Sequence, residues 1–146
     1  AGMGALKAKG FVAVSSQLAV PCPEIGYSPV IDLLGTGSAG DIIIIEVKAT
    51  GSAGCNRRRI GRGVSLPSLC GTSINISDTW KHRHLLQLSI QCYCARQVLG
   101  EAHGIPFPRI NGWLLTLSGD ANAHVTELPK QYVHIDWSKV VYNIEN

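Results

Sequence analysis

Four consecutive isoleucines at positions 42–45 restrict the fold of this chain more than any other feature of its sequence. A strand with one face in water alternates apolar and polar side chains, whereas an unbroken β-branched run fits a strand that is covered on both faces. The run is far shorter than the roughly 20 apolar residues that cross a bilayer, so no membrane span is expected. Residues 41–50 are therefore predicted to form a central strand.

Strand-forming residues also dominate positions 11–20 and 27–34. Glycines at 35, 37 and 40 can supply a tight reversal, so residues 27–34 and 41–50 are predicted to pair as a β-hairpin. Later strands are expected at 110–117 and 123–128, on either side of a turn, and residues 131–142 are ambiguous.

One long helix is predicted over residues 80–99, capped by Ser77 or Asp78 and ended by Gly100. Its apolar stripe is made of Leu85, Leu88, Cys92 and Leu99. Residues 51–77 are rich in Gly, Ser, Arg and Asn without clear periodicity, which is typical of a long functional loop. Strands combined with one covering helix indicate an α/β fold.

The composition fits a single domain. The 146 residues are 45% hydrophobic and 16% charged, which favours a well-packed core over disorder. Because Ala1-Gly2 before Met3 resembles an expression scar, residues 1–10 are interpreted as a tag remnant and N-terminal tail, and residues 11–146 as one domain. Five cysteines without a signal peptide predict reduced thiols in an intracellular protein of the cytoplasm or nucleus.

Acidic and basic side chains meet where the isoleucine run ends. Glu46 and Lys48 project from the same face because side chains alternate along a strand. Asp32 joins that face only in an even register, opposite Ile42 or Ile44; the second option puts Asp32 and Glu46 roughly 7–8 Å apart as diagonal neighbours. Two such carboxylates could share a divalent ion such as Mg²⁺. The plain alternative is a solvated ion pair, since Glu-x-Lys is common by chance.

The segment Ser-Pro-Val-Ile-Asp at 28–32, followed by Ile-Ile-Glu-Val-Lys at 44–48, resembles the PD-(D/E)XK nuclease signature, although the proline precedes Asp32 by three residues rather than one. The helix that bears Gln87 and Gln91 resembles the glutamine-bearing helix of lambda-exonuclease, YqaJ and RecB-like nucleases. The resemblance covers about residues 28–128. It implies a restriction-endonuclease-like core, with a central mixed β-sheet flanked by helices.

The resemblance also implies metal-dependent hydrolysis of DNA phosphodiester bonds. Asp32, Glu46 and the Val47 carbonyl would hold Mg²⁺ or Mn²⁺, Lys48 would orient the attacking water or the phosphate, and Gln87 would help to position Lys48 or the substrate. An exonuclease of recombination or viral replication is the expected subtype, and a virus-encoded protein is one of the expected origins. Endonuclease activity, an RNA substrate and assembly into a homo-oligomer remain alternatives at this point. The alternative function is that of a catalytically weak or inactive module with the nuclease fold, which binds nucleic acid.

Basic residues flank the expected acidic site. Nucleic-acid contacts are predicted for a group of loop and helix residues, namely Arg57, Arg58, Arg59, Arg62, Arg83 and Gln91, while Lys81, His82 and His84 add positive charge or polarity at the helix start. Helical spacing places Arg83, Gln87 and Gln91 on one stripe that could face the site. Ordinary helix surface and a solvated basic loop are the alternatives, because the net charge of +3 alone does not demonstrate a polyanionic partner.

Two features depart from the family pattern or compete with it. The family fold normally begins with a helix that often brings another acidic residue, but only ten residues precede Phe11 here, so a truncated or minimal version is expected, with Glu24 as a weak substitute. The competing interpretation is a zinc site, whose candidate ligands are Cys55, Cys70, His82, His84, Cys92 and Cys94. It is disfavoured because no Cys-x-x-Cys pair is present.

Overall fold

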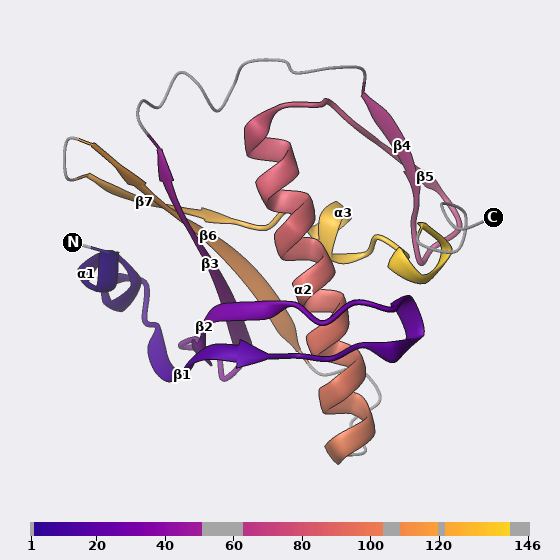
Figure 1. The fold of residues 1–146 in the computed structure, drawn as a ribbon. Coiled ribbons are helices and arrows are strands. Elements are labelled where there is room, and N and C mark those ends of the chain that lie inside the picture. Colours follow the sequence, from indigo (N-terminus) through magenta and orange to yellow (C-terminus); the bar gives the residue numbers. More distant parts are fainter. Residues whose placement is uncertain (1, 51–62, 104–108, 120–121, 141–146) are drawn as a thin grey trace.

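The computed structural model describes residues 2–50, 63–103, 109–119 and 122–140 (Figure 1). A mixed five-stranded sheet has the order β1-β2-β3-β6-β7, and β4 and β5 form a separate two-stranded sheet. The strands are β1 Val12–Ala19, β2 Val30–Thr36, β3 Ile42–Thr50, β4 Val64–Pro67, β5 Ser73–Ile76, β6 Ile110–Ser118 and β7 Ala123–Glu127. The helices include α1 Gly2–Ala8, α2 Trp80–His103, α3 Lys130–Val133 and the short 3-10 helix η1 Pro23–Ile25, and residues 137–140 are also helical. The expected α/β class, with a central mixed sheet flanked by helices, is confirmed.

Strand β3 lies in the middle of the large sheet, and both of its faces are covered. Ile43, Ile44 and Ile45 are 1%, 0% and 0% exposed. Ile44 belongs to a core cluster that includes Leu88 of α2, whereas Ile43 and Ile45 belong to a second cluster that includes Leu6 of α1. The isoleucine run is therefore unbroken because successive side chains enter two different cores, as the sequence predicted.

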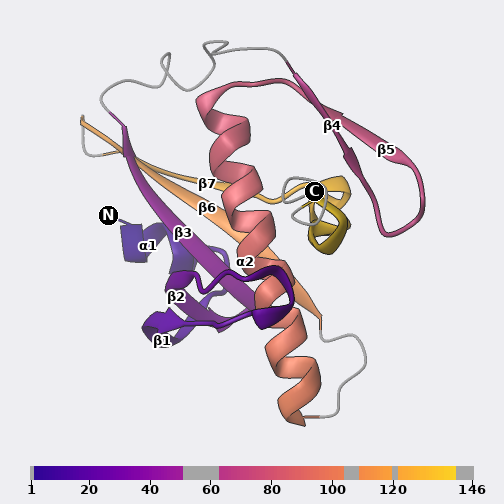
Figure 2. The ribbon, with the colours of Figure 1, turned by 45° about the vertical axis from the view of Figure 1, so that its right-hand side comes forward.

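Helix α2 connects β3 to the parallel strand β6 and covers one face of the sheet (Figures 1 and 2). The other strand pairs are antiparallel. Gly112 of β6 allows the close approach of this helix, since a Cβ there would lie 2.8 Å from Leu88 Cγ and 3.0 Å from Cys92 Sγ. In both views the C-terminal end of β3 and the N-terminal end of α2 lie at the same end of the molecule.

The predicted hairpin is present as β2 and β3. Its turn is closed by the Gly37 N–H, which donates to the Asp41 carbonyl at 2.9 Å, and Gly40 has a φ of +80° that favours glycine. Strand β2 begins at Val30 rather than at residue 27, because Cys22 and Tyr27 form an isolated bridge around η1. The residues before Val30 therefore close a turn and do not extend the strand.

Two expectations about the middle of the chain were wrong. Helix α2 continues past Gly100 to His103, since one glycine costs a helix only about 1 kcal/mol and does not force it to end. The predicted loop at 51–77 contains β4 and β5 within its described part, while residues 51–62 lie outside the described ranges. Alternate residues Ile74 and Ile76 of β5 are buried in the core, which a four-residue strand signals too weakly to be recognised in the sequence.

The N-terminal residues take part in the fold rather than forming a tail. Residues 2–8 form α1, whose Leu6 is fully buried against the face of the sheet opposite α2. A helix therefore does precede the first strand, but its sequence GMGALKA contains no carboxylate. No helix within the described ranges has both the length and the apolar character of a membrane span.

Candidate active site

Strand β3 presents Glu46 and Lys48 on the face that α2 covers. They share this face with Ile44, which packs in the α2-side core. The β2–β3 register pairs Leu33 with Ile45 and Leu34 with Ile44. Continued by one residue, this register puts Asp32 directly opposite Glu46. The even register, which puts Asp32 on the face of Glu46, was predicted. The predicted partners Ile42 and Ile44 were wrong, because the turn sets a register in which the residue opposite Asp32 lies two positions beyond Ile44.

Asp32 is tied to the backbone of β3. The Val47 N–H donates to Asp32 Oδ2 at 2.9 Å. Regular pairing of β2 with β3 stops at Leu33. Beyond this point the Asp32 carboxylate accepts the hydrogen bond of the Val47 amide. This hydrogen bond holds the Asp32 carboxylate next to Glu46. It also satisfies the Val47 N–H, which would be costly to bury without an acceptor.

Glu46 is a buried carboxylate with partners on both oxygens. The residue is 4% exposed, Lys48 Nζ lies 3.2 Å from Oε1, and Gln91 Nε2 donates to Oε2 at 2.8 Å. A buried charge is tolerated only when it is paired and hydrogen-bonded, and these two contacts supply that compensation. The Lys48 side chain is 28% exposed, so its ammonium lies at the boundary between the buried Glu46 carboxylate and solvent.

Helix α2 supplies polar side chains to this face at helical spacing. Gln91 is 1% exposed and touches Glu46, and Gln87 is half-buried one turn earlier. Gln91 Oε1 and His84 Nδ1 are buried without a hydrogen-bond partner among the described residues. Orphaned buried polar atoms are rare in folded proteins and often mark a site that accepts a water, an ion or a substrate group.

Arg83 does not join this stripe, although its spacing from Gln87 and Gln91 suggested that it would. Its Nε and Nη2 donate to the two carboxylate oxygens of Asp78 at 2.6 and 2.9 Å, on the protein surface. The hydrogen bond from Arg83 lowers the pKa of Asp78, and the same bond raises the pKa of Arg83. A carboxylate five residues earlier thus turns the guanidinium away from the sheet.

His84 was expected in the basic flank or in the disfavoured zinc site, and the structure instead places it within the electrostatic reach of Lys48. Burial lowers the pKa of His84 below its ordinary value of 6.5, and the positive charge of Lys48 lowers it further. Burial and the Lys48 charge thus both favour the neutral imidazole. Its separation of seven residues from Gln91, two helical turns, is the sequence signal that could have identified it.

The donors present fit a hard divalent cation. Asp32, Glu46 and the Val47 carbonyl offer oxygen atoms, which Mg²⁺ and Mn²⁺ prefer, and the orphaned Gln91 Oε1 could accept a hydrogen bond from a metal-bound water. Within the described part of the chain, no three side chains of His, Cys, Asp or Glu gather in a metal-binding cluster. Such a cation would thus be held by two carboxylates and the backbone, and it would compete with Lys48 for Glu46 Oε1.

The described cysteines form no metal-binding cluster with His, Asp or Glu side chains of the described ranges. Cys22, Cys92 and Cys94 are buried thiols, and burial raises the pKa of both Cys92 and Cys94 to about 12, so neither is a thiolate at neutral pH. Cys70 is exposed on the turn between β4 and β5. The remaining predicted residues lie outside the described ranges; they are Cys55, Arg57, Arg58, Arg59 and Arg62.

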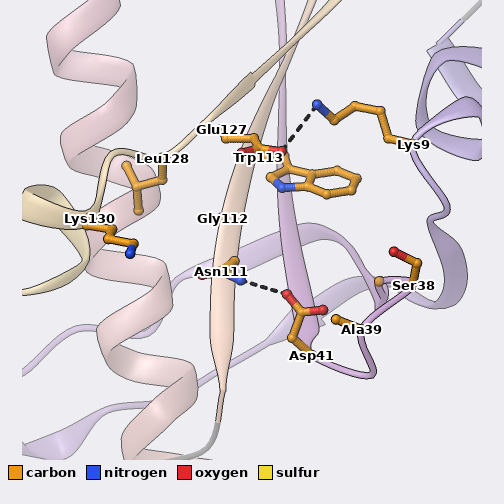
Figure 3. A pocket seen from close by; sticks show the side chains of 11 residues that line it. Lys9, Ser38, Ala39, Asp41, Asn111, Gly112, Trp113, Glu127, Leu128 and Lys130 are labelled. Atoms are coloured by element: carbon orange, nitrogen blue, oxygen red, sulfur yellow. Dashed lines mark hydrogen bonds and ion pairs between the residues drawn. The ribbon is translucent and has the colours of Figure 1, made fainter.

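A cavity of about 360 Å³ lies at the other end of β3 and β6, away from Glu46 (Figure 3). Four of its polar side chains pair with one another, since Asn111 Nδ2 donates to Asp41 Oδ2 at 2.6 Å and Lys9 Nζ lies 3.2 Å from Glu127 Oε1. Lys9 also lies over the ring of Trp113, 5.4 Å from its centroid. These contacts join α1, the hairpin turn and β7, so we assign this cavity a structural role.

Comparisons with known proteins identify no family for this chain. No family model matches it, and no curated protein matches it. Six chains among the solved structures match. A matching chain is that of the crystal structure of SSO0001, with 13% identity and a TM-score of 0.45, over 98% of this chain and 52% of that one. The present chain therefore spans about half the length of that protein, and similarity at this level carries no argument about function.

Proposed function

We propose that this chain is a metal-dependent nuclease of the PD-(D/E)XK type that hydrolyses DNA phosphodiester bonds, with a restriction-endonuclease-like core. The observation that supports this proposal is the convergence of Asp32, Glu46 and Lys48 on one face of β2 and β3, with Gln91 of α2 bonded to Glu46. A buried carboxylate and a half-buried one beside a partly exposed lysine are chemically suited to a cation and a phosphate.

Each residue has a distinct part in this proposal. Asp32, Glu46 and the Val47 carbonyl hold Mg²⁺ or Mn²⁺, which when bound polarises the phosphate and activates a water molecule. The Val47 N–H and Gln91 orient the two carboxylates through hydrogen bonds at 2.9 and 2.8 Å. Lys48, at the solvent boundary, hydrogen-bonds a non-bridging phosphate oxygen or the attacking water and stabilises the developing negative charge.

The experiment is cleavage of labelled linear and circular DNA in magnesium, manganese or EDTA. Metal-dependent cleavage by the wild type that is lost in Lys48→Ala and Asp32→Asn supports the proposal. Lys130→Ala, which removes an exposed lysine at the far cavity, is the matched control and should retain activity. Preference for linear DNA identifies an exonuclease, and cleavage that is unaffected by both site variants contradicts the proposed site.

A second candidate is a nuclease-fold module that binds nucleic acid without cleaving it. The observation that favours it is that Lys48 and Gln91 already engage both oxygens of Glu46, so the carboxylate is compensated without a cation. Salt-sensitive retention of DNA together with no cleavage in either metal selects this function over the first.

A further inference from the structure

Trp80 differs from the other two tryptophans of the chain in its exposure. It is 48% exposed at the start of α2, whereas Trp113 and Trp137 are 7% and 6% exposed. Trp137 donates its indole N–H to Ser89 Oγ, and Trp113 packs against Phe11. Packing in the protein interior therefore accounts for Trp113 and Trp137, but it does not account for the exposed Trp80.

The Trp80 ring is held in place by its neighbours. The Arg83 guanidinium lies over it, 5.4 Å from the ring centroid, and Asp78 fixes that guanidinium through two hydrogen bonds. The His84 ring lies 6.3 Å away at an interplanar angle of 34°. An exposed aromatic ring that is oriented before binding loses little conformational entropy when a ligand stacks on it.

Trp80 begins the helix that reaches the candidate active site, since Gln91 of α2 bonds to Glu46. His84, one helical turn after Trp80, senses the charge of Lys48, and Lys48 contacts Glu46. The start of α2 and the end of β3 also lie at the same end of the molecule in both views (Figures 1 and 2). A planar group stacked on Trp80 would therefore place an attached phosphate toward Lys48.

We propose that Trp80 is a stacking platform for an unpaired nucleobase of single-stranded DNA, which directs the adjoining phosphodiester toward Lys48. This inference rests on the proposed function, whose substrate it narrows to a single-stranded segment or a frayed end. An aromatic face flanked by a cation accepts any base, because every base has a π-face, whereas paired bases inside a duplex are already stacked.

The test is a binding titration in EDTA, which measures affinity without cleavage. The probes are a short single-stranded oligothymidylate and a blunt, hairpin-closed duplex of equal length, and the readouts are the dissociation constant and tryptophan fluorescence. Trp80→Leu should weaken binding to the single strand about tenfold and abolish quenching, while Trp80→Phe should retain most of the affinity. Tyr27→Leu removes another exposed aromatic ring outside the site, and it should bind like the wild type.

The outcomes separate this inference from the proposed function. Unchanged single-strand affinity in Trp80→Leu, or equal affinity of the wild type for both probes, overturns the platform even if the wild type cleaves DNA. Trp80-dependent binding and quenching without metal-dependent cleavage supports the platform and counts against the nuclease. Absence of binding to either probe overturns the platform, and thermal unfolding of each variant shows whether a loss of binding comes from misfolding.

Discussion

Gln91 of α2 and Glu46 of β3 are joined by a buried hydrogen bond of 2.8 Å between residues 45 positions apart in the sequence. The bond links the helix to the central strand at the point where the sheet carries its acidic pair. Gln91 Oε1 has no hydrogen-bond partner among the described residues, so the contact that orients the amide there is the one to the Glu46 carboxylate.

Gln91→Leu should destabilise the protein, because the leucine fills the space but leaves a buried Glu46 oxygen without its donor. The expected loss is about 1–3 kcal/mol in the free energy of unfolding, measured by urea denaturation at neutral pH. Gln97→Leu, at a half-buried glutamine further along α2, is the control and should change stability by less than about 0.5 kcal/mol. Equal effects of the two substitutions would show that the Glu46 contact is not responsible.

Asp32→Asn should separate metal binding from folding. An asparagine oxygen can still accept the hydrogen bond from the Val47 N–H, so the unfolding temperature without metal should stay close to that of the wild type. Magnesium or manganese should raise the unfolding temperature of the wild type, since a ligand at 100 times its Kd contributes about 2.7 kcal/mol, and should have little effect on the variant.

The control for that experiment is Asp136→Asn, which neutralises a buried carboxylate that accepts a hydrogen bond from Ser138. This variant should respond to metal like the wild type. A wild-type unfolding temperature that does not change with either metal, or a metal response that survives in Asp32→Asn, would contradict the assignment of Asp32 as a ligand.

Gly112→Ala tests how closely α2 approaches the sheet. The added methyl group would lie 2.8 Å from Leu88 Cγ and 3.0 Å from Cys92 Sγ, so the helix must shift or the side chains must strain. We expect a loss of about 1–3 kcal/mol in thermal or chemical unfolding. Gly4→Ala in α1, where a Cβ meets nothing within 4 Å, should be neutral or slightly stabilising. Similar effects at both positions would argue against the packing explanation.

The sequence predicted the parts of the site that depend on local alternation. Glu46 and Lys48 share a face because they are two residues apart on one strand, and the isoleucine run identified that strand as central. The position of Asp32 could not be derived, since it depends on a register that the turn between Thr36 and Ile42 sets. Alternation restricts the register only to even shifts, which left Ile42 and Ile44 as the two expected partners of Asp32, and neither is the residue found opposite it.

The side chains on α2 show the same limit. Helical spacing put Arg83, Gln87 and Gln91 on one stripe, but a long side chain goes to the strongest nearby partner, which for Arg83 is Asp78 at the surface. Gln91 is short and buried, and its direction follows from its backbone position. Leu6 was missed because a seven-residue helix gives too little periodicity to be distinguished from a tail.

His84 should make stability depend on pH below neutrality. Its pKa lies below 6.5 in the folded protein, chiefly because of burial and secondly because of Lys48, so the unfolded chain binds the proton more readily. The neutral imidazole therefore contributes stability above about pH 6.5, and this contribution is lost as the pH falls from there through the folded pKa. In His84→Gln, the fall in unfolding free energy over this window should be smaller than in the wild type.

The pKa itself can be followed by NMR titration of the His84 ring proton. Lys48→Met should raise this pKa because it removes the positive charge, yet leave it below 6.5 because burial is the larger cause. Lys130→Met, at the far end of the sheet, should leave the titration unchanged. An unchanged His84 titration in Lys48→Met would show that the two side chains do not interact, and the path from Trp80 through His84 to the acidic pair would lose its middle step.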